Sequence, residues 1–129
     1  MPHVIEQTQL AADMDAELAQ LSGNVSIYCR VVKVFFNSWA DHHKELDIAW
    51  REGRREHCVT VLHKLYLGAK SIAALQLAGA LQTLKLQFAD ADADVGLPDI
   101  TLLQDLEELA AGTEQAINQR LDCSPEDYV

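Results

Sequence analysis

Apolar residues recur along most of the chain at spacings of three and four, the period of an amphipathic helix. The stripe is clearest over residues 25–51, where it consists of Tyr28, Val32, Phe35, Trp39, His42, Leu46 and Ala49. Similar stripes cover residues 5–21, 55–89 and 99–121, and no alternation of polar and apolar residues is long enough to indicate a strand. The pattern predicts an all-α protein with helices at about 5–21, 25–51, 55–89 and 99–121.

Turn signals separate the predicted helices. Weak signals lie at residues 22–24 and at Gly53, and a stronger one, rich in Asp, covers residues 90–98. Asp99 follows as a candidate N-cap for the last helix. Four helices with short connections favour an antiparallel up-and-down four-helix bundle, and we expect a single domain over residues 1–129.

The composition is that of an ordinary globular protein, with 49% hydrophobic and 23% charged residues. The net charge of −10 argues against nucleic acid and anionic membranes as partners, because both favour clustered Lys and Arg. No apolar run approaches the roughly 20 residues needed to span a bilayer. The cysteines are Cys29, Cys58 and Cys123, an odd number without a C-x-x-C pair, which argues against a disulfide framework. We therefore expect a cytoplasmic protein.

The predicted helix over residues 55–89 carries a histidine away from the core. Its core side is formed by Cys58, Val61, Leu65, Ile72, Leu75 and Ala78. At about 100° per residue, His63 lies opposite the centre of that side and is expected to be exposed. Its neighbours Val59, Tyr66 and Leu67 are more apolar than an ordinary solvated face. Periodicity alone still favours a surface histidine whose apolar neighbours are incidental.

Residues 21–121 resemble the histidine phosphotransfer (HPt) domains of bacterial and eukaryotic phosphorelays. The resemblance lies in the ungapped register of Phe35, Leu46, Ala49, Gly53, His63, Lys64, Leu65, Ser71, Ile72, Ala73, Ala74 and Leu77. It implies a four-helix bundle in which a long third helix presents one exposed phospho-acceptor, His63. The family usually has Lys three residues and Gly four residues after that histidine, where this chain has Tyr66 and Leu67.

The resemblance also implies a function. The imidazole of His63 would accept a phosphoryl group from the aspartyl phosphate of a receiver domain and pass it to the Asp of another receiver. Free imidazole titrates near about pH 6.5, so its neutral, nucleophilic form is available at neutral pH. Mg²⁺ would be bound by the receiver, so this chain would need no cofactor or metal of its own. Because no segment resembles a nucleotide-binding motif, we expect a phosphoryl carrier and not an ATP-dependent enzyme.

Several residues around His63 are candidates for the same site. Lys70 lies about 10 Å further along the helix and leans back toward the histidine, so we expect it to contact the phosphoryl oxygens, with Lys64 as a less well aimed neighbour. The surface that docks the partner would comprise Glu56, Val59, Thr60, Tyr66 and Leu67. An equally open alternative buries Val59, Tyr66 and Leu67 under the N-terminal helix. The partners would be receiver domains of response regulators or hybrid histidine kinases, and the protein is expected to be a monomer.

Two other readings of the function stay open. Tyr66 and Leu67 also fit a degenerate HPt-like module that docks on a receiver or kinase and regulates it without being phosphorylated. A helical adaptor or chaperone unrelated to phosphorelays is a third possibility.

Two patterns resemble metal sites but are discounted. His42 and His43 are adjacent on a helix and diverge by about 100°, so they are not expected to chelate one ion together with His57. Asp90-x-Asp92-x-Asp94 resembles the start of a calcium-binding loop, but the positions that need Gly and a bidentate Glu are Val95 and Thr101.

Overall fold

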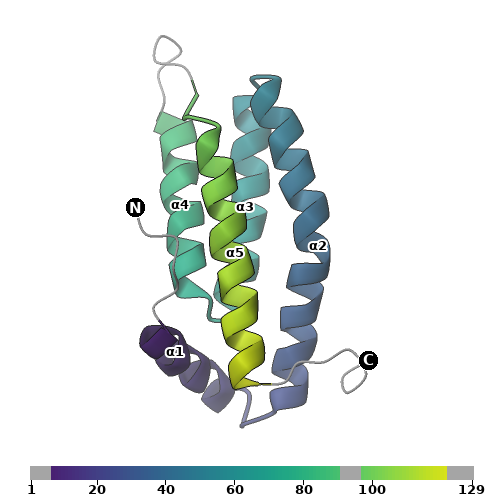
Figure 1. Ribbon diagram of the computed structural model, residues 1–129, viewed down its shortest axis with the longest axis vertical. Helices are drawn as coiled ribbons and strands as arrows, with labels where there is room; N and C mark the ends of the chain where they lie inside the picture. Colours follow the sequence, from purple (N-terminus) through teal and green to yellow (C-terminus); the bar gives the residue numbers. More distant parts are fainter. Residues whose placement is uncertain (1–6, 91–96, 122–129) are drawn as a thin grey trace.

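The computed structural model describes residues 7–90 and 97–121, and the regular secondary structure in this part of the chain is all α-helix (Figure 1). The five helices are α1 (Gln7–Gln20), α2 (Val25–Arg51), α3 (Arg55–Ser71), α4 (Leu75–Asp90) and α5 (Thr101–Arg120). The predicted all-α fold is confirmed for the described residues, and α2 has the bounds that the sequence predicts. Residues 92 and 94 of the discounted calcium-loop pattern lie outside the described part.

Helices α2 to α5 lie side by side and alternate in direction along the chain, while α1 crosses one end of them (Figure 1). The core between them receives buried side chains from all five helices, among them Met14, Tyr28, Leu46, Leu62, Leu77, Leu81, Phe88 and Ile117. Trp39 is buried, as its place on the apolar stripe predicts, and Trp50 is buried as well.

The single long helix predicted over residues 55–89 is wrong, because the chain turns back on itself after Ser71. Ala73 adopts the left-handed conformation with φ +59°. The N–H of Ala73 bonds to the carbonyl of Lys70 at 3.0 Å, and the N–H of Ala74 bonds to the carbonyl of Ala69 at 2.9 Å. This pair of bonds is the Schellman ending of an α-helix, which glycine usually supplies. An alanine in that position gives no turn signal in the sequence.

The break changes which residues of α4 face the core. Leu75, predicted on the core side, is 46% exposed, whereas Ala78 is buried as predicted. The buried stripe of α4 consists of Leu77, Ala78, Leu81, Leu84 and Phe88. At about 100° per residue this stripe is rotated by roughly 130° from the stripe of α3, so one continuous helix would not bury both.

A buried tyrosine on α2 is hydrogen-bonded to the turn between α3 and α4. The hydroxyl of Tyr28, on α2, donates a hydrogen bond of 2.7 Å to the carbonyl of Ile72. Burial, with the nearby Glu17 carboxylate as a smaller cause, raises the pKa of Tyr28 well above its usual value. The phenol is therefore held as a neutral donor to the turn.

Helix α3 also packs closely on α2. A Cβ added to Gly68 would meet two ring carbons of Phe35, at 2.6 and 2.8 Å. Since Phe35 is itself buried, the ring has little space into which it could move. The absence of a side chain at Gly68 is what lets the two helices approach here.

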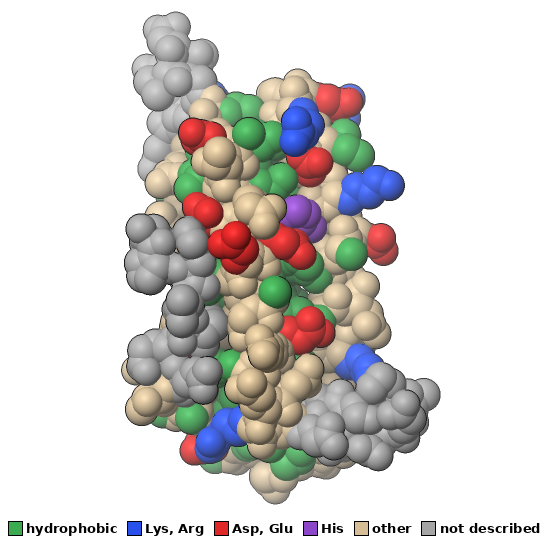
Figure 2. Space-filling view, in the orientation of Figure 1, with side chains coloured by type: hydrophobic (Ala, Val, Ile, Leu, Met, Phe, Trp, Pro, Cys, Tyr) green, Lys and Arg blue, Asp and Glu red, His purple; other side chains and the backbone are tan. Residues whose placement is uncertain are grey.

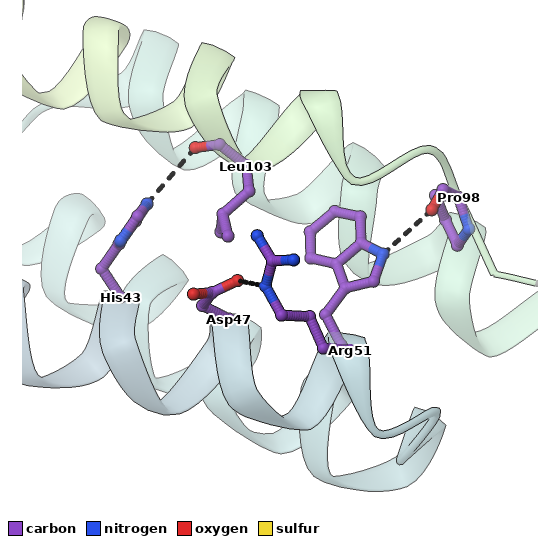
Figure 3. A network of polar contacts seen from close by, with 6 residues as sticks. His43, Asp47, Arg51, Pro98 and Leu103 are labelled. Atoms are coloured by element: carbon purple, nitrogen blue, oxygen red, sulfur yellow. Dashed lines mark hydrogen bonds and ion pairs between the residues drawn. The ribbon is translucent and has the colours of Figure 1, made fainter.

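Polar bonds hold α5 and the segment before it against α2 (Figure 3). Trp50 donates its indole N–H to the carbonyl of Pro98 at 2.9 Å, and the Nε2 atom of His43 lies 3.3 Å from the carbonyl oxygen of Leu103. One turn further along α5, the indole N–H of Trp39 donates to Glu107 at 2.9 Å.

The start of α5 differs slightly from the prediction. Ile100 is the N-cap residue by position, and Asp99 acts just before it: its carboxylate accepts a bond of 3.0 Å from the N–H of Thr101. The predicted N-cap is therefore displaced by one residue: Ile100 takes that position without a side-chain bond, and Asp99 bonds to the first N–H of the helix.

The cysteines differ from the expectation. Cys29 is disulfide-bonded, so the expectation of no disulfide is wrong at this residue, and the argument from cysteines for a reducing compartment is weakened. Cys58 is a free, buried thiol, and burial raises its pKa to about 11. Within the described residues, no helix has the length and apolar character needed to cross a membrane.

Candidate functional site

His63 is exposed near the middle of α3, as its place opposite the core stripe predicts. Its Nδ1 atom lies 3.2 Å from the Nζ atom of Lys85, which comes from the neighbouring helix α4. A lysine ammonium can only donate hydrogen bonds, so Nδ1 is the acceptor. A neutral His63 in this contact therefore carries its proton on Nε2, the nitrogen that Lys85 does not contact.

Tyr66 lies beside His63 and two lysines. Its ring is stacked with the imidazole of His63, with centroids 6.1 Å apart and planes inclined by 28°. The Nζ atoms of Lys70 and Lys85 lie 5.4 and 5.7 Å from the centroid of the Tyr66 ring, within the range of cation–π attraction. We call these four residues, His63, Tyr66, Lys70 and Lys85, the His63 cluster.

The His63 cluster lies in a stretch whose charge is opposite to that of the whole chain. Residues 57–89 contain Lys64, Lys70 and Lys85 but no Asp or Glu, although the chain carries a net charge of −10. Figure 2 shows a different face, on which acidic side chains gather over α5. The α3–α4 side is therefore less hostile to an anion than the α5 side.

The predicted neighbours of His63 have different surroundings. Lys70 belongs to the His63 cluster through its contact with the ring of Tyr66. Lys64 is exposed. Among the predicted docking residues, Glu56, Thr60 and Leu67 are exposed, while Val59 and Tyr66 are half-buried against the core. Leu67 is 52% exposed, so the alternative that buries it under the N-terminal helix is wrong for this residue. The hydroxyl of Thr60 is bonded to the carbonyl of Glu56 at 3.1 Å.

Lys85 is the residue that the sequence analysis missed. In one continuous helix it would lie about 33 Å along the axis from His63. The turn at Ala73 folds α4 back beside α3 and brings the two side chains together. The signal that could have revealed this is the change in phase of the apolar stripe between Ala69 and Leu77.

The other described histidines have different partners. His43 and His57 lie beside carboxylates, at 3.4 Å from Glu107 and 2.9 Å from Glu45 respectively. His42 is half-buried, and its buried Nδ1 atom has no hydrogen-bond partner among the described residues. Within residues 7–90 and 97–121, no group of three or more His, Cys, Asp and Glu side chains is arranged to hold a metal ion.

The site is a surface and not a cavity. A hollow of about 270 Å³ is lined by Leu10, Ala11, Ala116, Gln119 and Arg120, at the contact of α1 with α5. A smaller one of about 90 Å³ lies beside Glu45 and His57. His63 lines neither of these two hollows and is exposed on the surface of α3.

The chain was compared with protein-family models, with curated proteins and with solved structures, and none of the three comparisons finds a match. The function must therefore be argued from the chain's own residues.

Proposed function

We propose that this protein is a histidine-containing phosphotransfer protein, which relays a phosphoryl group between receiver-domain aspartates through His63. The observation that carries the proposal is an exposed imidazole in the middle of a helix of an all-helical protein, contacted by the ammonium of Lys85. The HPt-like register around His63 agrees with this assignment. The proposal includes an antiparallel four-helix bundle formed by α2 to α5, a monomeric state and a cytoplasmic location.

The transfer needs little chemistry from this chain. A ring nitrogen of His63 attacks the phosphorus of the partner's aspartyl phosphate, the N–P bond forms, and the P–O bond to the aspartate breaks. The aspartate leaves as a carboxylate, and the ring releases one proton to solvent. In the second transfer, the carboxylate of another receiver attacks phosphorus, and the imidazole leaves after regaining a proton. Mg²⁺ bound by the receiver would neutralise the phosphoryl oxygens during both steps.

The charge around His63 favours this reaction. The phosphoryl group brings negative charge to α3, where Lys70 and Lys85 supply two ammonium groups within 6 Å of the Tyr66 ring. No Asp or Glu occurs in residues 57–89 to repel the group. Fixed positive charge placed where negative charge arrives lowers the barrier to transfer.

A second candidate is a module that docks on a receiver or kinase without accepting phosphate. It is favoured by Leu67, whose side chain is 52% exposed one turn after His63 and occupies space that a glycine would leave to the partner. Stacking of Tyr66 on the imidazole also restricts one face of the ring. In this reading the surface of α3 binds the partner, and His63 contributes contact alone.

The two candidates are separated by a transfer experiment with His63→Gln. A panel of receiver domains is charged with acetyl phosphate or a kinase and mixed with the wild type or with the variant. We expect an acid-labile, base-stable label on the wild type alone. His43→Gln is the matched control, because His43 lies at the α2–α5 contact and should leave labelling intact.

Binding decides the remaining outcomes. A receiver that binds the wild type and His63→Gln equally but labels neither would replace the relay by the docking function. Binding that survives loss of the exposed Leu67 side chain and of His63, but fails when another surface is disrupted, would indicate an unrelated helical adaptor.

A further inference from the structure

The contact between Lys85 and His63 supplies a step that phosphoryl transfer needs, the delivery of a proton to the departing ring. We propose that Lys85 is the proton donor to Nδ1 of His63 when a phosphoryl group leaves Nε2, and the proton acceptor from Nδ1 when one arrives. This inference rests on the proposed function, but its chemistry can be tested without any receiver domain.

The position of Lys85 at the ring determines where its proton can go. Its Nζ atom lies 3.2 Å from Nδ1 and, being an ammonium, donates to it. Tyr66 stacks with the imidazole, with the two planes inclined by 28°. A phosphoryl group is therefore expected on Nε2, the nitrogen that Lys85 does not contact, while the lone pair of Nδ1 stays directed at the lysine.

Loss of the phosphoryl group requires a proton on Nδ1. An oxygen of the acceptor, from an aspartate or from water, attacks phosphorus, the N–P bond breaks, and its electron pair stays on Nε2. Without a new proton the ring would leave as an imidazolate anion, which is a strong base and a poor leaving group. Lys85 passes its proton to Nδ1 as the bond breaks, so that neutral imidazole leaves, and the lysine amine then takes a proton from solvent.

A lysine is a suitable acid for this step. An ordinary lysine ammonium titrates near about pH 10.4, so it keeps its proton at neutral pH while the ring still carries phosphorus. The basicity of Nδ1 rises as the N–P bond breaks, and this rise favours transfer of the proton from Nζ to the ring. Proton transfer by a positioned side chain typically contributes about 10²–10⁴-fold to a rate.

The same two atoms serve the arrival of a phosphoryl group, because a group that lowers a barrier lowers it in both directions. In the resting ring, Nε2 carries the proton and Nδ1 accepts from Lys85. When the Nε2 proton is released to solvent, the lysine proton moves onto Nδ1, and the lone pair of Nε2 becomes free to attack phosphorus. As the N–P bond forms, the proton returns from Nδ1 to Lys85. The sum is one proton released to solvent, as in the proposed transfer.

The other titratable groups around the ring leave this role to Lys85. On α3 they are Tyr66, which stacks with the imidazole, and Lys70, whose Nζ atom lies 5.4 Å from the centroid of the Tyr66 ring. The hydrogen bond to Nδ1 comes from Lys85 on α4.

The carboxylates of the neighbouring helices have other partners. None occurs in residues 57–89, which include most of α3 and α4. Glu45 of α2 pairs with a histidine in the first turn of α3, and Glu107 of α5 pairs with side chains of α2. The acidic residues of α1 lie on a helix that crosses one end of the others (Figure 1).

The first measurement is the resting contact, read from the ¹⁵N shifts and two-bond couplings of the His63 ring in the unphosphorylated protein. We expect the Nε2–H tautomer with a hydrogen-bonded Nδ1 in the wild type and in Lys85→Arg, and shifts averaged between both tautomers in Lys85→Gln. An Nδ1–H tautomer in the wild type would overturn the inference.

The second measurement is the lifetime of phosphorylated His63 as a function of pH. Potassium phosphoramidate is the donor, from which imidazole takes the phosphoryl group and releases ammonia, and the label that His63→Gln lacks is the one followed. Below about pH 6.5, where solvent protonates free imidazole, we expect the wild type and Lys85→Gln to lose the group at similar rates. At about pH 9 the wild type should lose it about tenfold faster, because solvent then supplies few protons and the lysine still carries one.

Lys85→Arg separates proton donation from positive charge. A guanidinium keeps the charge and donates hydrogen bonds but does not give up its proton in proteins, so this variant should follow Lys85→Gln in the pH profile. Lys44→Gln removes a charge from an exposed site on α2 and should match the wild type. Circular dichroism would show that the variants keep their helices.

Three results would each overturn the inference. One is a ratio of wild-type to Lys85→Gln rates that does not change with pH, as a purely structural role would give. Another is a Lys85→Arg profile like that of the wild type, as charge alone would give, and the third is failure of phosphoramidate to label His63. The proposed function fails differently. If phosphoramidate labels His63 with the expected pH dependence but no charged receiver does, the role of Lys85 stands and the relay does not.

Discussion

Helices α3 and α5 are held in the structure by different means. The backbones of α3 and α4 run much closer together than those of α2 and α5. On its other side α3 also approaches α2 closely, because Gly68 has no Cβ to meet the Phe35 ring. On the α5 side the tryptophans keep the helices apart, and polar bonds to Glu107 and to backbone carbonyls span the distance.

This difference in packing explains why His43, on α2, and His63, on α3, differ in their hydrogen-bond partners. His43 lies between α2 and α5, and its Nε2 atom has a backbone carbonyl and a carboxylate as neighbours, so both of its contacts favour a donor. His63 lies on the closely packed pair, where a lysine of α4 reaches its Nδ1 atom, so that nitrogen is an acceptor. Because α3 and α4 lie close together, Lys85 reaches the Nδ1 atom of His63, and the Nε2 atom stays available. The contacts of His43 instead join α2 to α5.

The largest effect is expected from filling the space that α3 needs. In Gly68→Ala the new methyl group would meet the Phe35 ring at 2.6 Å, and such overpacking should lower the free energy of unfolding by about 1–3 kcal/mol. Gly79→Ala is the matched control on α4, because nothing lies within 4 Å of a Cβ there. It should raise the free energy of unfolding by about 0.5–1 kcal/mol through its helix propensity. Urea unfolding measures both, and equal effects would refute close approach at Gly68.

A smaller effect is expected from the turn between α3 and α4. Tyr28→Phe removes the hydroxyl that bonds to the carbonyl of Ile72, and leaving this acceptor without its partner should cost about 1–2 kcal/mol. The pH dependence gives a second readout, because the folded-state pKa of Tyr28 is raised. The stabilisation is then complete below about pH 10, where tyrosine ionises in the unfolded chain, and is lost as the pH rises above it.

The variant should therefore lose stability less steeply than the wild type above that pH. Urea unfolding at a series of alkaline pH values tests this. Identical slopes for the wild type and Tyr28→Phe would show that the hydroxyl is not held as described.

The smallest effect is expected at the polar bonds of α5. Glu107→Ala removes the acceptor of the Trp39 indole and the carboxylate beside His43, and should cost about 0.5–1 kcal/mol because Glu107 is partly exposed to water. Glu108→Ala, at an exposed neighbouring position, should cost less. Thermal unfolding compares the two. A larger loss in Glu108→Ala would contradict the account of how α5 is held.

The sequence predicts well wherever the apolar stripe continues without interruption. The stripe of α2 runs from a turn signal at residues 22–24 to Gly53, and the helix has the predicted bounds. The exposure of His63 follows from a few residues on either side of it, so it was predicted correctly even though the helix was drawn too long. Local periodicity is sufficient for both results.

The sequence does not predict the turn between α3 and α4, because an alanine forms it. It also does not predict the contact of Lys85 with His63, because that contact depends on the turn. Ala73 adopts a conformation that favours glycine, so the end of α3 carries no sequence signal. In a continuous helix Lys85 would lie about 33 Å from His63, so the periodicity gives no reason to connect the two residues. Lys70 was expected near a phosphoryl group from its distance along the helix alone. Side-chain contacts between helices depend on how the helices pair, which the pattern of one helix does not contain.

The tight turn at Ala73 also bears on how quickly the site assembles. His63 and Lys85 are only 22 positions apart and lie on helices joined by three residues, so their encounter closes a short loop and needs no contact with α1 or α5. Pairings of low sequence separation are the ones that small helical proteins form on the microsecond-to-millisecond timescale. The pair of His63 and Lys85 is thus encoded in a single contiguous stretch of chain, and it can be formed at the start of folding, before the remote segments have docked.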